Sequence, residues 1–163
     1  MNRKRSFPPV VNADIEILIL GSLPGEISLK HQQYYAHPQN RFWALVSGVI
    51  EEDITSLSYL DRLDALLRNK IGLWDVVAEA KRIGSLDGNI REHVHNDLLA
   101  LLVELPVLKT IAFNGGTAER LGMKVLRERA SDYRILRLPS SSAAYTRPYT
   151  EKLSQWMNLR SKI

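Results

Sequence analysis

The sequence contains no cysteine, and this absence excludes several kinds of chemistry. A chain without thiols forms no disulfide bond, ligates no zinc through sulfur and carries no iron–sulfur cluster. The four histidines, His31, His37, His93 and His95, do not have the spacing of a metal site. We therefore expect neither a metal ion nor another cofactor.

Long apolar runs are also absent. Every hydrophobic stretch is much shorter than the ~20 residues that a membrane-spanning helix requires. The first residues, MNRKRSFPP, are charged and lack the apolar core of a signal peptide. For these two reasons we expect the protein in the cytoplasm. Because 45% of the 163 residues are hydrophobic, we expect one domain over residues 1–163 with an ordinary core.

Three familiar catalytic motifs are missing. The segment GSLPGE at residues 21–26 has neither the Gly-Lys-Ser/Thr of a P-loop nor the GxGxxG spacing of a dinucleotide-binding turn. The serines at 140–142 are not in the GxSxG context of a nucleophile elbow, and no histidine follows them. Nucleotide cofactors and acyl hydrolysis therefore have little support.

Positive charge is concentrated in one part of the chain. The formal net charge is +4, yet residues 109–163 hold 11 Lys and Arg against 4 Asp and Glu, and residues 1–108 hold 11 against 14. A basic surface attracts polyanions and supplies the sequence-independent part of nucleic-acid binding. A basic face that is merely solvated would have the same composition.

Short apolar segments alternate with helical patterns along the chain. We expect strands at residues 15–20, 71–77, 107–113 and 133–138. The last should be an edge strand because arginines alternate with apolar residues in it. Helices are expected over residues 38–50, 57–69, 89–105, 117–127 and 149–160. Such alternation predicts a three-layer α/β/α sandwich around a central, mainly parallel four-stranded sheet.

The loops that follow the strands carry most of the polar and aromatic residues of interest. The carboxyl ends of parallel strands meet at one edge, so the segments GSLPGE, WDVVAEAKRIGSLD, FNGG and LPSSSAAY should line a single cleft. Gly21 and Gly25 allow the backbone to approach a ligand there. Aromatic rings, amides and hydroxyls beside a basic surface suit an extruded nucleobase and its flanking phosphates.

The same loops carry an ordered set of motifs that resembles the uracil-DNA glycosylase superfamily. HPQNRFW at residues 37–43 is similar to the HPxNRFW segment of mismatch-specific uracil glycosylases, and GSLPG at 21–25 matches their first motif apart from one position. LPSSSAAYTR at 138–147 lies where the superfamily has its second motif. The longer pattern, with WDV and RxGSLD, most resembles the hypoxanthine-DNA (deoxyinosine) glycosylase branch and spans most of the chain.

This resemblance implies a monofunctional DNA glycosylase of base excision repair. Such an enzyme hydrolyses the N-glycosidic bond of a flipped hypoxanthine or uracil and leaves an abasic site. The implied partner is DNA, duplex or single-stranded, and we expect a monomer without a cofactor. The thermophile-type uracil glycosylases resemble one another in carrying an iron–sulfur cluster on four cysteines, which this chain lacks.

Two departures from the superfamily pattern concern catalysis. Most members resemble one another in having Asp or Asn in motif one to position the attacking water, and this chain has Leu23 there. In motif two, Leu138 and Ser140 flank the proline. The hypoxanthine branch is thought to rely on the asparagine of its HPxN segment, which is Asn40 here. We predict that Asn40 holds the water, although the sequence alone also fits an asparagine that caps a helix.

Further residues take their roles from the resemblance. Tyr35 aligns with the aromatic that stacks on the flipped base, and Gly25 replaces a bulky tyrosine that excludes thymine. Asp75 falls where relatives read the base edge, and a carboxylate accepts from N1–H of hypoxanthine or N3–H of uracil. Capping of the next turn is its alternative role. The predicted substrate-binding residues are Gly21, Ser22, Gly25, Tyr35, His37, Asp75 and Asn114, the last also suited to a turn.

DNA contacts are predicted mainly from the second motif. Its serines, with Ser22 and Ser85 from neighbouring loops, are expected to contact phosphates. Relatives insert a leucine from the loop that follows, and Tyr145 is the predicted wedge here. The predicted DNA-binding residues are Ser85, Ser140, Ser141, Ser142, Ala143, Ala144, Tyr145 and Arg147. We assign Tyr34, Phe42 and Trp43 to the core.

Two other functions stay open from the sequence. A non-catalytic module that recognises damaged or mismatched DNA is compatible with Leu23 and would bind DNA without forming abasic sites. A hydrolase of free nucleosides or nucleotides would act on monomers with little dependence on salt. The basic C-terminal third favours DNA over monomers.

Overall fold

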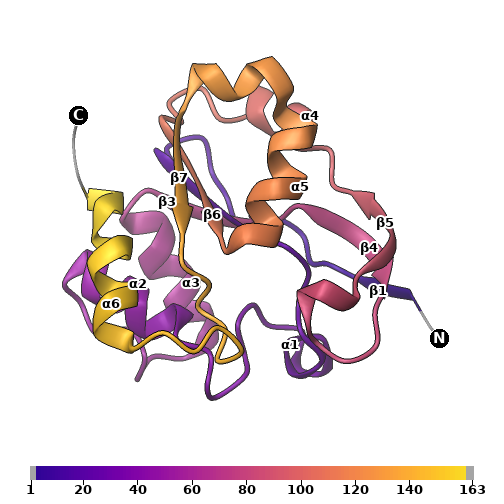
Figure 1. Cartoon of the computed structure of the whole chain (residues 1–163). Coiled ribbons are helices and arrows are strands. Elements are labelled where there is room, and N and C mark those ends of the chain that lie inside the picture. Colours follow the sequence, from indigo (N-terminus) through magenta and orange to yellow (C-terminus); the bar gives the residue numbers. More distant parts are fainter. Residues whose placement is uncertain (1–2, 161–163) are drawn as a thin grey trace.

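The computed structural model describes residues 3–160 and is built around a parallel four-stranded sheet (Figure 1). Its strands are β3 (Ile71–Asp75), β2 (Ile17–Gly21), β6 (Thr110–Asn114) and β7 (Arg134–Leu138), in that spatial order. The central strands β2 and β6 are buried on both faces, which explains their aliphatic sequences. The predicted α/β sandwich is confirmed, and β7 is an edge strand as expected.

Helices cover both faces of this sheet (Figure 1). One face packs against α2 (Phe42–Ile50), α3 (Tyr59–Arg68) and α6 (Tyr149–Trp156), which continues into the 3-10 turn η3 (Met157–Arg160). The other face packs against α4 (Leu98–Val103) and α5 (Gly116–Leu126), which is followed by η2 (Arg127–Asp132). Tyr34, Phe42 and Trp43 are buried in the first of these two cores, as predicted.

The predicted helix over residues 89–105 is wrong. This segment forms the strand β5 (Arg91–His95) and then the short helix α4, which begins where Asp97 accepts a 3.0 Å hydrogen bond from the amide of Ala100. All five residues of β5 are exposed, so no apolar face holds this segment in a helix. Pairing with the neighbouring strand β4 (Val77–Lys81) decides its conformation instead.

The strand expected at residues 71–77 is divided between two sheets. Its first part is β3, and after Val76 the chain enters β4, which pairs antiparallel with β5 and with β1 (Arg3–Arg5). Asn96 fixes the junction, since its side-chain amide donates to the carbonyl of Asp75 at 2.7 Å. This small sheet, which the sequence did not suggest, leads into the segment 82–89 beside the short helix α1 (Glu26–His31) (Figure 1).

Within residues 3–160, no helix has the length and apolar character needed to cross a membrane. The same residues contain no cluster of three or more His, Cys, Asp or Glu side chains able to hold a metal ion.

Candidate functional site

A cavity of about 640 Å³ lies at the carboxyl edge of the parallel sheet. It is lined by the loops that follow β2 and β7, the last residues of β3 and β6, the turn before α2 and the segment 85–89, which contains the 3-10 turn η1 (Asp87–Asn89). The sequence-predicted residues in its lining are Gly21, Ser22, Gly25, Tyr35, His37, Asn40, Asp75, Ser85, Asn114, Ser140, Ser141, Ser142, Ala143, Ala144 and Tyr145. Arg147 is the exception, since it lines a neighbouring hollow.

Gly21 allows two polar groups to meet at the bottom of the cavity. It is the last residue of β2 and lies opposite Asp75 in the register of β3. A Cβ atom on Gly21 would lie 2.6 Å from Oδ1 of Asp75 and 2.7 Å from the hydroxyl of Tyr35. Real side chains do not tolerate such distances, so glycine is required for Asp75 and Tyr35 to occupy these positions.

Asp75 is buried without a partner for its carboxyl group. Its side chain is 3% exposed, and within the described residues neither oxygen forms a hydrogen bond or ion pair, so it does not cap the following turn. Burial raises the pKa of Asp75 to about 7, and repulsion from Asp87 adds to this effect while Arg82 opposes it. An unpartnered carboxyl group in a cavity is available to a ligand.

Tyr35 presents both a ring and a hydroxyl group. One face of its ring stacks on Phe42, with centroids 4.0 Å apart and planes at 11°. Its hydroxyl is buried and unpartnered in the described chain, and its pKa is raised by burial and by the charge of Asp75. The backbone has φ of 54°, an unfavourable conformation for tyrosine that sites of function often retain. From the sequence, only the ring of Tyr35 was predicted to contact the substrate.

Asn40 belongs to a turn that precedes α2. The helix begins at Phe42 rather than near residue 38, because His37 and Asn40 close a turn through a 2.9 Å backbone hydrogen bond. Oδ1 of Asn40 accepts from the amide of Phe42 at 2.9 Å, so the residue satisfies the first N–H group of the helix although Arg41 is the N-cap. Its side-chain nitrogen donates no hydrogen bond to any described residue. The amide therefore has donor capacity left for a ligand.

The loop of the second motif is tied to the rest of the site. Asn114 and Ser141 form a reciprocal pair, in which the Asn114 amide donates to the Ser141 hydroxyl and its oxygen accepts from the Ser141 backbone, both at 2.9 Å. The carbonyl of Ser141 accepts from the amide of Arg41 at 2.9 Å. Ser141 therefore links the end of β6 to the turn that carries Asn40.

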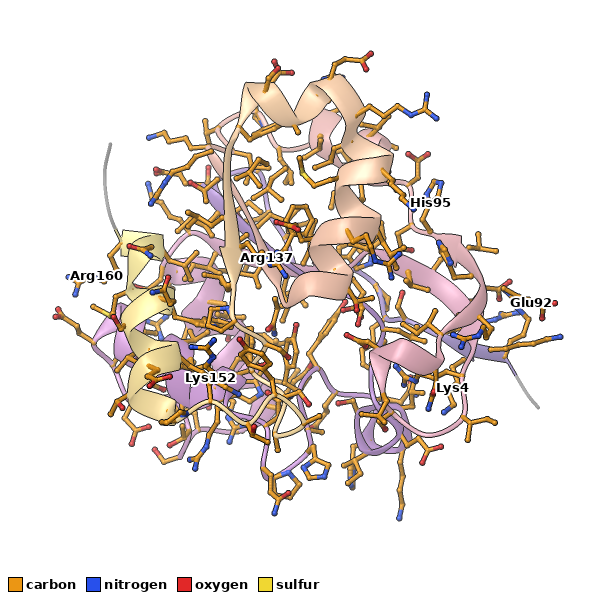
Figure 2. All side chains as sticks on the ribbon, in the orientation of Figure 1. Lys4, Glu92, His95, Arg137, Lys152 and Arg160 are labelled. Atoms are coloured by element: carbon orange, nitrogen blue, oxygen red, sulfur yellow. The ribbon has the colours of Figure 1, made fainter. Side chains whose placement is uncertain are left out.

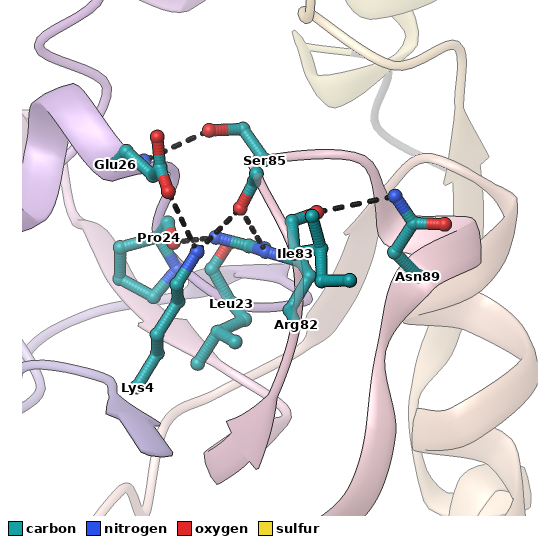
Figure 3. Close-up of polar contacts among 9 residues, drawn as sticks. Lys4, Leu23, Pro24, Glu26, Arg82, Ile83, Ser85 and Asn89 are labelled. Carbon is teal, nitrogen blue, oxygen red and sulfur yellow. Dashed lines mark hydrogen bonds and ion pairs between the residues drawn. The ribbon is translucent and has the colours of Figure 1, made fainter. Parts of the chain in front are cut away.

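The loop of the first motif is held by Arg82, a residue that the sequence analysis did not select (Figure 3). Arg82 is 1% exposed, and its guanidinium donates to the carbonyls of Leu23, Pro24 and Gly84. From β1, Lys4 donates to the same Gly84 carbonyl at 2.6 Å. The motif RxGSLD was the available signal, because an arginine that satisfies three carbonyls fixes two loops at once.

Two serines at this edge are also engaged. The hydroxyl of Ser85 accepts a 2.9 Å hydrogen bond from the backbone of Glu26 (Figure 3). A Cβ atom on Gly25 would lie 3.2 Å from the same hydroxyl, so Gly25 leaves room for the segment 82–89. The hydroxyl of Ser22 donates to Oδ1 of Asp87 at 2.6 Å.

Asp87 is a second carboxyl group in the cavity lining that the sequence analysis missed. Burial raises its pKa, whereas the hydrogen bond from Ser22 and the charge of Arg82 lower it. Asp75 has no such stabilising hydrogen bond. The two acids therefore share one cavity in unequal surroundings.

Leu23 packs into the core. It is buried in the cluster that contains Val76, Val77 and Ala80. The position at which superfamily members resemble one another in carrying Asp or Asn thus holds an apolar side chain that belongs to the core and also borders the cavity.

An exposed ring, Tyr145, lies between the cavity and a neighbouring basic hollow. Tyr145 is 41% exposed, with the Lys152 ammonium 5.5 Å and the Arg147 guanidinium 5.9 Å from its ring centroid. Lys152 is itself buried and donates to the carbonyl of Ser142 at 3.0 Å. Together with Arg137, these cations line the neighbouring hollow of about 610 Å³, and Figure 2 shows Arg137 beside β7 and Lys152 on α6.

Comparison with known proteins identifies proteins named as DNA glycosylases as relatives. The sequence pattern of the uracil DNA glycosylase superfamily matches residues 8–160. A Methanosarcina barkeri protein named hypoxanthine DNA glycosylase is 44% identical over 94% of this chain and 96% of its own length. One of the same name from Methanosarcina acetivorans is 41% identical over 94% and 95%. A solution NMR structure of a candidate uracil DNA glycosylase from M. acetivorans superposes with a TM-score of 0.86, at 40% identity over 97% of this chain and 96% of that one.

Proposed function

Because the chain belongs to the uracil DNA glycosylase superfamily, we propose that it is a DNA glycosylase of base excision repair that removes a deaminated base. It hydrolyses the N-glycosidic bond of a hypoxanthine or uracil that has been flipped out of the DNA, and it leaves an abasic site. The observation that carries this proposal is the cavity in which Asp75, Tyr35 and Asn40 all have unused hydrogen-bonding or stacking capacity. Residues 1–163 act as one domain.

The base lies in the cavity with its Watson–Crick edge toward Asp75. The free face of the Tyr35 ring stacks on the base, since Phe42 already covers the opposite face. Such stacking contributes about 1–3 kcal/mol per base. An oxygen of Asp75 accepts from the ring N–H of the lactam, and the cavity of about 640 Å³ that Gly21 and Gly25 line has space for a purine.

The attacking water is held by Asn40. Its Oδ1 has a second lone pair beyond the one used by Phe42, and its free amide donates to the substrate. Bond cleavage passes through an oxocarbenium-like sugar, so the protein stabilises charge with fixed dipoles and needs no covalent intermediate. The buried Ser141 keeps Asn40 in position, because its carbonyl accepts from the amide of Arg41.

The flanking DNA lies along the basic side of the cavity. The serines of the second motif and Ser85 contact phosphates there, and Arg147 adds charge near the backbone. Tyr145 enters the space that the flipped base leaves in the duplex. A recognition module without activity is the second candidate, because Leu23 removes the usual water-holding side chain and packs into the core.

The test uses labelled duplexes that carry one hypoxanthine or one uracil, followed by alkali to cleave abasic sites. We expect cleavage with the unaltered protein and a loss of about 100-fold or more with Asn40→Ala. Asn40→Asp keeps an oxygen to cap Phe42 but removes the donor, so it separates helix capping from chemistry. Asn158→Ala, on the exposed turn η3, is the matched control and should cleave normally.

Two results would contradict the proposal. Salt-sensitive binding without cleavage of either duplex would favour the recognition module. Cleavage that survives Asn40→Ala in a folded protein would remove Asn40 from the mechanism while leaving the activity in place.

A further inference from the structure

Asp75 is an acid without a counter-ion at the bottom of a cavity. No described cation forms an ion pair with it, and its Oδ2 is buried without a hydrogen bond. The guanidinium of Arg82 is committed to the carbonyls of Leu23, Pro24 and Gly84. Ionising a carboxyl group in such surroundings is unfavourable, because neither water nor a donor compensates the charge.

The titratable groups around Asp75 act on its protonation in opposite directions. The charge of Asp87 favours the neutral acid, whereas the guanidinium of Arg82 favours the ionised form. The hydroxyls of Tyr34, Tyr35 and Tyr59 stay uncharged because burial raises their pKa. Asp87 is better suited to carry a charge, because the hydroxyl of Ser22 donates to it at 2.6 Å. When two acids share one cavity, the better-solvated member ionises and its charge holds the proton on the other.

We infer that Asp75 reads the base as a neutral carboxylic acid, which donates to the exocyclic oxygen of a lactam and accepts from the adjacent ring N–H. This inference rests on the proposed function and deepens it. A lactam edge presents one acceptor beside one donor, as at O6 and N1–H of hypoxanthine or at O4 and N3–H of uracil. An ionised carboxylate offers acceptors alone and would repel the carbonyl oxygen, whereas the neutral acid pairs with both atoms as a side-chain amide does.

The inference predicts how excision depends on pH. The pKa of Asp75 is raised to about 7, so the reading form is lost as the pH rises through that value. The rate of single-turnover excision of hypoxanthine at enzyme concentrations well below saturation reports the free protein, so it should decline about tenfold per pH unit above about pH 7. In Asp75→Asn this decline should disappear, because an amide does not titrate.

Asp87→Asn distinguishes the reading role of Asp75 from a purely structural role, which predicts no change in the pH dependence of excision. Removing the negative charge of Asp87 makes ionisation of Asp75 easier, so the midpoint of the decline should move to lower pH. Asp64→Asn is the matched control, since Asp64 is exposed on α3 and outside the cavity lining, and its midpoint should stay in place. A decline that persists in Asp75→Asn, or that does not move in Asp87→Asn, would overturn the inference.

The protonation itself is measured without activity, by carbon-13 NMR of the aspartate carboxyl groups, with the Asp75 signal assigned from its absence in Asp75→Asn. A midpoint near 7 supports the neutral acid, and a midpoint below about 5 overturns it. Excision that stays constant above about pH 7 despite a midpoint near 7 overturns the reading role but not the glycosylase. Failure to excise any base, whatever the midpoint, removes the glycosylase and the reading role together.

Discussion

Asp75 is a buried acid whose protonation differs from that of an ordinary aspartate, and this difference affects stability as well as binding. Its pKa is about 7 in the folded protein and 3.8 for an ordinary aspartate, so the folded state holds the proton more tightly than the unfolded chain does. As the pH rises from about 4 to about 7, the free energy of unfolding of the unaltered protein therefore decreases by the cost of ionising Asp75 in the folded state.

Asp75→Asn removes this dependence. At about pH 8 we expect the variant to have the higher free energy of unfolding, by about 2–4 kcal/mol, and below about pH 4 the difference should vanish. Urea unfolding at a series of pH values measures both limits. A difference between the two proteins that does not vary with pH would show that Asp75 does not titrate as described.

The cavity requires glycine at position 21, because the space beside it is occupied by neighbouring side chains. Gly21→Ala places a Cβ atom against Asp75 and Tyr35, so we expect a loss of about 1–3 kcal/mol in the free energy of unfolding and a large loss of excision. Gly88→Ala is the matched control, because a Cβ atom there meets no atom within 4 Å. Equal behaviour of the two variants in thermal unfolding would contradict the packing at the bottom of the cavity.

At the scale of elements, the position of Arg82 after β4 explains why the small sheet matters. Arg82→Met leaves the carbonyls of Leu23 and Pro24 buried without a donor, which should lower the free energy of unfolding by about 2–4 kcal/mol. The rates of amide hydrogen exchange of residues 21–29 should rise in the same variant. Arg68→Met, which removes only an exposed pair with Glu52, should change neither measurement appreciably. Unchanged exchange in Arg82→Met would mean that the first loop does not depend on this arginine.

The strands β2, β3 and β6 were predictable because each is a short, mostly apolar and buried segment, and β7 was predictable because arginines alternate with aliphatic residues in it. The strands β1, β4 and β5 were not, since their polar sequences form a sheet only through pairing between distant segments. The same reason hid Arg82 and Asp87, which reach the cavity from the segment after β4. The motifs located the lining residues, but their hydrogen bonds depend on the tertiary structure.

Over the whole molecule, the cavity opens beside the basic part of the chain, and Tyr145 stands between the cavity and the hollow lined by Arg137, Arg147 and Lys152. This ring is exposed, and two cations lie within 6 Å of its centroid. Its neighbours Ala143 and Ala144 are too small to fill the space left by a purine. A wedge matters for a duplex, where the base must be unpaired and replaced, and matters little for a single strand.

Tyr145→Ala should therefore lower excision from a duplex about tenfold or more and from a single strand only about two- to threefold, since it removes stacking of about 1–3 kcal/mol. Tyr145→Phe keeps the ring and should retain the activity on duplexes. Tyr133→Ala is a matched aromatic control. Tyr133 directly precedes β7, at the opposite end of the strand from the Tyr145 loop, and its ring packs against the core. This variant should lower excision from both substrates equally, through reduced stability. Parallel single-turnover assays with the same hypoxanthine strand, alone and annealed, give the ratio of the excision rates on duplex and single-stranded DNA. An equal loss on both substrates in Tyr145→Ala would place this ring in base binding rather than in the duplex.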